Sequence, residues 1–225
     1  MKDQLKKSIK NVKLRLLLLS IIINVHAFAQ DKTIVVDISD KAKFEVVNRQ
    51  LSITNKDKKA IIHLNGKENN GIAWIKGLKF EKGIIEFDVK GKDVMQQSFV
   101  GIAFHGMNDS TYDAVYFRPF NFQSPDTARK NHSVQYISMP QYDWYMLRQN
   151  FTGVYENALI GAISADAWFH AKIIVNADNI KVFVNNDAKP SLVIHPLNNY
   201  STGNIGFWVG NNSDGDFSNL SIQNK

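Results

Sequence analysis

Short runs in which apolar and polar residues alternate, separated by turn residues, make up almost all of residues 30–225. Successive side chains of a β-strand point to opposite faces of the sheet, so this alternation is typical of half-buried strands. The clearest example is Gly83 to Lys90, in which Ile85, Phe87 and Val89 alternate with a mostly charged face. Many short strands with almost no helical pattern predict an all-β chain, folded as one two-sheet jelly-roll sandwich over residues 30–225.

Residues 1–29 follow a different pattern. A basic start is followed by an apolar run from Leu16 to Ile23 and then by the small residues around Phe28. This order is typical of a secretory signal peptide with its cleavage site, and the apolar run is shorter than a membrane-spanning helix. We therefore expect a mature chain that begins near Gln30, is periplasmic or secreted, and has no stable membrane insertion after cleavage. A retained N-terminal anchor is the alternative.

Charge and cysteine content narrow the function further. The formal charge of +6 is concentrated before Gln30, where six basic residues face one acidic residue, whereas the rest of the chain carries 21 basic and 20 acidic residues. A nearly neutral mature chain argues against nucleic acid as a partner. The chain contains no cysteine, which excludes disulfides, thiol catalysis and a lipid attached to cysteine. An exported domain without disulfides fits a bacterial periplasm or medium.

A predicted hairpin at residues 99–122 is the centre of the expected site. In its first strand Gly101 shares the face opposite the apolar one with His105, and in its second strand Tyr116 shares the corresponding face with Arg118. Small residues on this face would leave a hollow lined by aromatic and polar tips. Such a face suits a polar ligand with an apolar side, such as a sugar. The alternative is the solvated outer face of an ordinary sheet.

A long insertion, which begins with a predicted short helix at residues 142–151, is expected to extend this site, because long structured loops on β-scaffolds usually carry function. Arginine forks and amides bind hydroxyls or carboxylates, and aromatic faces stack on sugars. The simpler alternatives are that Arg118 pairs with Asp126, that Trp144 anchors the insertion in a core, and that His105 caps a turn. The predicted ligand-binding set is His105, Tyr116, Arg118, Asn121, Gln135, Trp144, Arg148 and Glu156.

Five segments carry a recognisable family pattern: GIIEFDV at 83–89, FVGIAFH at 99–105, YFRPFN at 116–121, IGFWVG at 205–210 and FSNLSI at 217–222. Together they resemble the concanavalin A-like lectin/glucanase superfamily. The chain is similar to its bacterial branch described as family 16 glycoside hydrolase-like or 3-keto-disaccharide hydrolase-like. The resemblance implies a two-sheet jelly roll with its ligand on the concave sheet. Lectins, binding modules and hydrolases all use that fold, so the resemblance does not select an activity.

Laminarinase-type members of that superfamily carry catalytic carboxylates on one strand, and the nearest match here is Glu86 with Asp88. Side chains two residues apart on a strand are separated by about 6.6 Å, close to the roughly 5–5.5 Å of a retaining glycosidase pair. The third position of the motif is Lys90, so the motif is broken. Two solvent-facing charges on an outer sheet explain the pattern better, and no catalytic residue is assigned.

The run from Asn211 to Asp216 is rich in oxygen ligands and could hold calcium, although a turn between two closing strands explains it equally well. The sequence has no histidine pair with metal-ligand spacing, no glycine-rich phosphate loop and no serine elbow. We therefore expect no metal site and no cofactor, with calcium as the one alternative.

Three functions remain open at this stage. The first is an exported jelly roll that binds glycan on its concave sheet. The second is a glycoside hydrolase or 3-keto-sugar lyase that acts in the same cleft, and the third is a structural exported β-sandwich without a ligand. A carboxylate with a raised pKa near Arg118 would favour the enzyme. A cleft of aromatics, amides and arginine would favour the binder, and burial of Arg118 and Tyr116 away from any cleft would favour the third.

Overall fold

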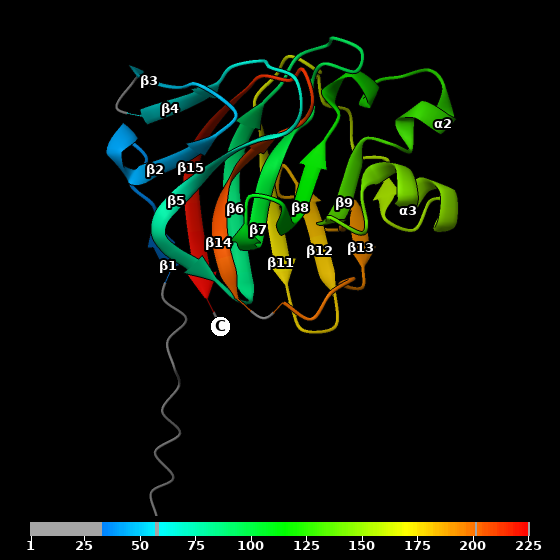
Figure 1. Ribbon diagram of the computed structural model, residues 1–225. Coiled ribbons are helices and arrows are strands. Elements are labelled where there is room, and N and C mark those ends of the chain that lie inside the picture. The colour runs from blue at the N-terminus through cyan, green and yellow to red at the C-terminus, as the bar shows by residue number, and fades with distance from the viewer. Residues whose placement is uncertain (1–32, 57–58, 201, 225) are drawn as a thin grey trace, which may run out of the picture. The chain divides into compact units, whose positions relative to one another are not determined.

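The computed structural model describes residues 33–56, 59–200 and 202–224, which form two packed antiparallel sheets (Figure 1). The eight-stranded sheet contains β1 (Thr33–Val35), β3 (Leu51–Lys56), β4 (Lys59–Leu64), β6 (Gly83–Lys90), β11 (Phe169–Val175), β12 (Ile180–Val184), β13 (Leu192–Ile194) and β15 (Gly215–Asn224). The seven-stranded sheet contains β2 (Phe44–Val47), β5 (Gly71–Phe80), β7 (Val100–Asn108), β8 (Thr111–Phe117), β9 (Val134–Met139), β10 (Glu156–Asn157) and β14 (Gly203–Val209). The predicted all-β sandwich is confirmed, whereas the predicted signal peptide lies outside the described residues.

Strands that are far apart in the sequence are neighbours in both sheets. The order is β13-β12-β11-β6-β15-β4-β3 in the eight-stranded sheet, with β1 paired to β15, and β10-β9-β8-β7-β14-β5-β2 in the seven-stranded sheet. The predicted hairpin of β7 and β8 is therefore flanked by β14 on one side and by β9 on the other. This arrangement brings β14, from near the end of the chain, and β9, which precedes the insertion, next to the central hairpin.

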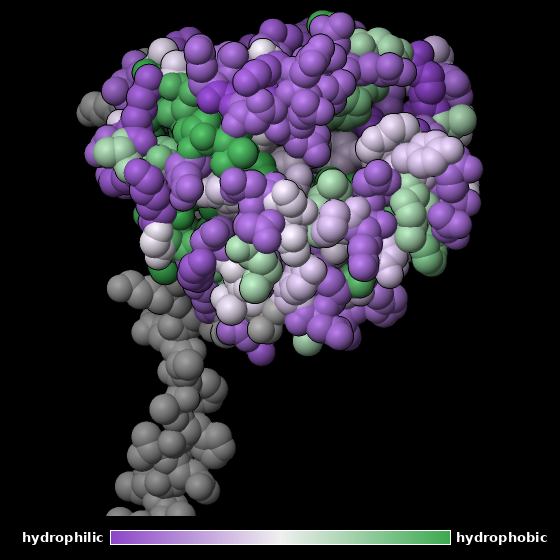
Figure 2. Space-filling view, viewed as in Figure 1, coloured by the Kyte–Doolittle hydropathy of each residue, from purple (hydrophilic) through white to green (hydrophobic). Residues whose placement is uncertain are grey.

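The hydrophobic core lies between the sheets. Ile85, Phe87 and Val89 of β6 are completely buried, as their alternation predicts, and so are Val100 and Ile102 of β7. Burial of side chains of this size contributes about 1.5–3 kcal/mol each, and core packing on this scale stabilises the sandwich without any disulfide. Hydrophilic residues cover most of the outer face seen in Figure 2.

Two short α-helices stand beside the end of the seven-stranded sheet in Figure 1. The helix α3 (Trp144–Asn150) lies inside the segment predicted to be helical, and its N-cap Asp143 accepts a hydrogen bond from the backbone N–H of Met146. The helix α2 (Thr127–Lys130) and two 3₁₀ turns, η1 (Lys41–Lys43) and η2 (Pro119–Asn121), were not predicted. None of the helices among the described residues is long and apolar enough to cross a bilayer.

The strand β7 is irregular where the sequence predicts regular alternation. His105 has a positive φ of 52°, and the register of β7 against β8 shifts between Phe104 and Asn108. An irregularity of this kind turns a side chain to the opposite face of the sheet. His105 therefore packs inward, with its ring stacked on Phe80 at a centroid separation of 6.0 Å. The prediction that His105 shares a face with Gly101 is wrong for this reason.

His105 belongs to a polar network inside the sandwich. Its Nδ1 lies 2.8 Å from a carboxylate oxygen of Asp113, and its Nε2 lies 2.6 Å from the backbone oxygen of Glu81. Asp113 is completely buried and also accepts hydrogen bonds from the Tyr136 hydroxyl at 2.8 Å and from the Asn198 amide. A buried charge persists only when it is paired and hydrogen-bonded, and these donors meet that requirement.

Removal of the Asp113 carboxylate should therefore destabilise the fold strongly. We expect Asp113→Ala to lower the free energy of unfolding by about 3–5 kcal/mol, because the buried His105 and Tyr136 and the partly buried Asn198 lose an acceptor. Asp93→Ala is the control, since Asp93 is exposed, and it should change the free energy by less than about 0.5 kcal/mol. Urea unfolding of both variants measures the difference. A small effect at both positions would contradict the importance of the network.

Candidate functional site

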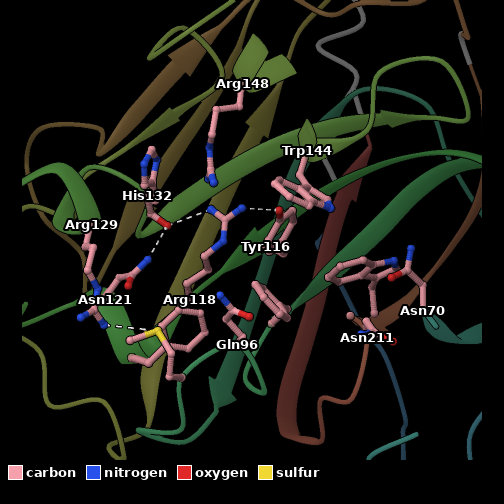
Figure 3. Close-up of a pocket in the computed structure, with 15 residues that line it drawn as sticks. Asn70, Gln96, Tyr116, Arg118, Asn121, Arg129, His132, Trp144, Arg148 and Asn211 are labelled. Carbon is pink, nitrogen blue, oxygen red and sulfur yellow. Dashed lines mark hydrogen bonds between the residues drawn. The ribbon is translucent and has the colours of Figure 1, made fainter. Parts of the chain in front are cut away.

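A pocket of about 520 Å³ lies at the end of the seven-stranded sheet, beside α2 and α3 (Figure 3). Segments that are distant in the sequence form its lining: Asn70, Met95, Gln96, Phe99, Tyr116, Arg118, Phe120, Asn121, Arg129, His132, Trp144, Arg148, Trp208, Gly210 and Asn211. Aromatic rings, amides and three arginines dominate this set. No carboxylate among the described residues lines the pocket.

An aromatic pair forms the part of the lining that stands on β8 and β14. Gly101 of β7 lies between Tyr116 and Trp208 in the strand register, and the centroids of the two rings are 4.9 Å apart. A Cβ atom at position 101 would lie only 2.1 Å from the backbone oxygen of Val115. The backbone therefore requires glycine here, and the hollow that the sequence predicts above Gly101 is occupied by these two side chains.

Arg118 lines the pocket but is only 4% exposed. Its Nη2 donates to the Tyr116 hydroxyl at 2.7 Å and to Oε1 of Gln135, and its Nη1 donates to the backbone oxygen of His132 at 2.8 Å. The guanidinium carbon also lies 4.9 Å from the ring centroid of Tyr116, in a cation–π contact. The sequence pattern predicted a polar tip that lines a hollow. The structure shows one held by its neighbours, so substitution of Arg118 affects the fold as well as the pocket.

Gln135 does not line the pocket, but it fixes the positions of Arg118 and Tyr116. It lies opposite Tyr116 in the register of β8 and β9, is 1% exposed, and accepts a hydrogen bond from the Tyr116 hydroxyl at 2.7 Å. Burial lowers the pKa of Arg118 and raises the pKa of Tyr116. Tyr116 therefore remains a neutral hydroxyl at physiological pH.

Glu156 is the carboxylate that balances the arginines. It lies opposite Gln135 in the register of β9 and β10, is 4% exposed, and receives a two-pronged contact from Arg148 at 3.1 and 2.8 Å. One of its oxygens also lies 2.8 Å from Nδ1 of His132 and 3.5 Å from Nη1 of Arg118.

The charges in this cluster shift the pKa of both titratable members. Burial by itself raises the pKa of Glu156, but the hydrogen bond and charge of Arg148, with the charges of Arg118 and His132, outweigh burial and lower it. Burial lowers the pKa of His132, and the positive charges of Arg148 and Arg118 add to this effect against the attraction of Glu156. The cluster therefore favours an ionised carboxylate and a neutral imidazole.

The outer wall of the pocket carries two further arginine contacts. Arg148 stands over the ring of Trp144 at 5.3 Å, and this tryptophan is 48% exposed. Arg129 of α2 donates to the sulfur of Met95 at 3.3 Å. Within the described ranges no carboxylate lies at ion-pair distance from Arg129, so a thioether, which is a weak acceptor, is its only polar partner.

Asn121 presents an acceptor that has no partner. Its Nδ2 donates to the backbone oxygen of His132 at 3.4 Å, whereas its Oδ1 is buried and accepts no hydrogen bond from the described residues. A buried polar atom without a partner costs about 1–3 kcal/mol. A hydroxyl donor that enters the pocket could satisfy this oxygen.

The structure brings most of the predicted site together. Five predicted residues line the pocket: Tyr116, Arg118, Asn121, Trp144 and Arg148. Gln135 and Glu156 lie behind it, and His105 belongs to the separate network in the core. That these residues contact a ligand stays a prediction.

Sequence reasoning missed several lining residues, among them Asn70, Gln96, Arg129, His132 and Trp208. They reach the pocket from loops and strands whose proximity depends on sheet order, which a single sequence does not specify. The sequence feature that could have indicated two of them is the polar segment after Asn121, which contains Arg129 and His132.

The carboxylates at the other candidate positions contact basic side chains. Glu86 and Asp88 lie on the face of β6 that points away from the core, where Lys172 pairs with Glu86 at 3.2 Å and His170 with Asp88 at 2.8 Å. They belong to the sheet that does not carry the pocket, as expected for outer charges. In the loop predicted as a turn or calcium site, Asp214 accepts a hydrogen bond from Lys92.

Comparison of the chain with known protein families and with curated proteins finds no match in either. Solved structures do share its fold. The carbohydrate binding module CBM66 from Bacillus subtilis matches with a TM-score of 0.58 at 13% identity, covering 80% of this chain and 96% of that chain. A protein of unknown function with a galectin-like fold, also from Bacillus subtilis, matches with a TM-score of 0.55 at 12% identity, covering 83% and 91%.

The Ca²⁺/Man3GlcNAc-bound exoplasmic/lumenal domain of VIP36 matches with a TM-score of 0.54 at 9% identity, covering 86% of this chain and 88% of that chain. At such identities the likeness shows the fold alone. The chain has a concanavalin A-like or galectin-like β-sandwich fold, which confirms the fold that the resemblance implied.

Acidification should weaken the fold through the Glu156 cluster. The native state lowers the pKa of Glu156 below 4.5 and that of His132 below 6.5, so the unfolded chain binds more protons at both positions. Their contribution to stability is therefore complete above about pH 6.5 and is lost as the pH falls through the two native pKa values.

Urea unfolding of the wild type and of Glu156→Gln over this range measures the effect, and the variant should lose part of the pH dependence below about pH 4.5. Glu68→Gln is the control, because Glu68 is exposed and outside every ion pair of the described residues. An unchanged slope in Glu156→Gln would contradict the assignment.

Proposed function

We propose that the protein binds carbohydrate in the pocket between the seven-stranded sheet and the helix α3. The observation that carries the proposal is the composition of the lining, which combines aromatic rings with amides and arginines. Aromatic faces pack against the C–H faces of sugars, while amide and guanidinium groups bind hydroxyls. The volume of about 520 Å³ is within the usual range for small-molecule sites.

The arrangement is also preorganised for a ligand. Gln135 accepts hydrogen bonds from both Arg118 and Tyr116, and Glu156 lies 3.5 Å from Arg118, so binding does not have to order these two side chains. Groups that are fixed before binding lose little conformational entropy when the ligand arrives. The carbohydrate-binding module and the sugar-bound lectin domain with the same fold support this proposal by analogy.

Glycoside hydrolase or 3-keto-sugar lyase activity is the less favoured alternative. A glycosidase needs a carboxylic acid that can donate a proton, which requires a raised pKa. The carboxylate beside Arg118 is Glu156, and its pKa is lowered. A structural sandwich without a ligand is also disfavoured, because Arg118 and Tyr116 reach the pocket. We also propose that the chain belongs to the family 16 glycoside hydrolase-like branch, as a member that binds carbohydrate.

Export completes the proposed function. We infer that residues 1–29 act as a signal peptide and that residues 30–225 form the exported domain in the periplasm or medium. The basic start, the apolar run and the small residues before Gln30 support this inference. N-terminal sequencing of the exported protein should give a first residue near Gln30. Exported material that begins at Met1 would refute cleavage.

The binding proposal is tested by two tryptophans of similar exposure. Trp144 lines the pocket and is 48% exposed, whereas Trp168 is 39% exposed and lies outside it. On a glycan found by array screening, Trp144→Ala should weaken binding about 3- to 10-fold, the loss of one aromatic stacking contact. Trp168→Ala should leave affinity unchanged, and both variants should keep nearly the same melting temperature.

Isothermal titration of the three proteins against the array hit measures these affinities, and product analysis on the same glycan detects any cleavage. Equal weakening by both substitutions would place the binding site elsewhere. Turnover of the glycan would establish the enzyme alternative, and no hit on the array would overturn the proposal.

A further inference from the structure

The pocket concentrates positive charge, although residues 30–225 as a whole have almost no net charge. Residues 30–225 carry 21 basic and 20 acidic residues. Arg118, Arg129 and Arg148 all line the pocket, and Glu156 is the one carboxylate that pairs with any of them among the described residues. With His132 neutral, the group has a net charge of +2. A concave site with one sign of charge and low-dielectric walls attracts ligands of the opposite sign.

Two of these arginines have unused donors. Arg148 gives Nε and Nη2 to Glu156, and no acceptor among the described residues bonds its Nη1. Among the described residues, the Met95 thioether is the one polar partner of the Arg129 side chain. Planar guanidinium groups match carboxylate and sulfate oxygens better than single hydroxyls. The structure therefore offers charged donors that a neutral sugar would leave without a counter-charge.

The pocket is also polarised. Figure 3 shows Arg129, His132 and Asn121 together on one side with Arg148 above them, and Asn70 with Asn211 on the other side. A ligand with one anionic end and one hydroxylated end would satisfy both sides at once.

We propose that the ligand is an acidic sugar unit, whose carboxylate or sulfate ester lies on the side of Arg129 and Arg148. Its hydroxyls donate to the free Oδ1 of Asn121 and bind the amides, and its apolar face packs on the aromatic lining. The inference rests on the proposed glycan binding and adds the charge of the ligand. A small inorganic anion does not meet the same requirements, because it has no apolar face for Phe99 and Trp144.

The test uses the protein produced from its full chain and matched pairs of probes. Oligogalacturonate and its carboxyl-reduced form are one pair, and sulfated dextran oligosaccharide and unmodified dextran oligosaccharide are the other. At low salt we expect at least one acidic member to bind about tenfold or more tightly than its neutral counterpart. A tenfold rise in sodium chloride should reduce that difference, because salt screens charges that remain in contact with water, and partly buried charges are screened less than exposed ones. Inorganic sulfate should compete only weakly.

Arg129 allows a clean substitution, because it pairs with no carboxylate in the part of the chain that the structure describes. Arg129→Gln should weaken binding of the acidic probe about tenfold or more, as expected for one charge-assisted contact, and should leave the neutral probe unaffected. Lys130→Gln is the matched control, since it removes the same charge one residue away, at an exposed position outside the pocket. It should change neither affinity.

The outcomes separate this inference from the function on which it rests. Equal binding of the acidic and neutral members of both pairs would overturn the acidic-sugar inference and leave glycan binding standing. The same effect for Arg129→Gln and Lys130→Gln would show that only the overall charge matters, which also overturns it. Binding to neutral glycans alone would reject an anionic ligand. Failure of every glycan, on the array and among these probes, would overturn the proposed function itself.

Discussion

The buried guanidinium of Arg118 is the constraint on which the pocket depends. A charge that is 4% exposed survives in a folded protein only when protein groups replace the water that it has lost. The Tyr116 hydroxyl, the Gln135 amide and the backbone of His132 do so here. Each of these partners comes from a different part of the chain, so the requirement to satisfy one side chain holds β8, β9 and the loop before β9 together.

The insertion after β9 serves both the fold and the pocket. Its short strand β10 supplies Glu156, which offsets the positive charge of Arg118 and Arg148, and its helix α3 supplies Trp144 at the pocket wall. The ion pair between Arg148 and Glu156 ties the helix to the strand. The side chains that face a ligand are therefore held by interactions that also stabilise the domain. Such a rigid lining is suited to recognition, since few side chains remain to be ordered on binding.

The placement of carboxylates favours binding over catalysis. The acidic residues of the strand motif, Glu86 and Asp88, lie on the other sheet and are paired with Lys172 and His170. Near the pocket, the cations around Glu156 keep its pKa low, which suits a counter-ion and not a proton donor. The excess of arginine on one side of the pocket, together with the free oxygen of Asn121, suits a ligand that is both anionic and hydroxylated.

The sequence by itself determined the two-sheet architecture, because the period of two in segments such as Gly83 to Lys90 is enough to select strands with one buried face. It also placed Tyr116 and Arg118 on one strand face, since that relation is local. It did not determine which strands become neighbours. Trp208 and His132 reach the pocket only because β14 and β9 flank the central hairpin, and that order depends on long-range packing.

The tertiary structure likewise determined the irregularity of β7 at His105 and the burial of Arg118. The shift in β7 turns His105 into the core, where Asp113 from the neighbouring strand receives it, and strict alternation cannot anticipate such a shift. The sequence did not predict the burial of Arg118, because its partners are spread along the chain from Tyr116 to Glu156. A charge can be buried only where several such partners converge in space, and their convergence exists only once the sheets have formed.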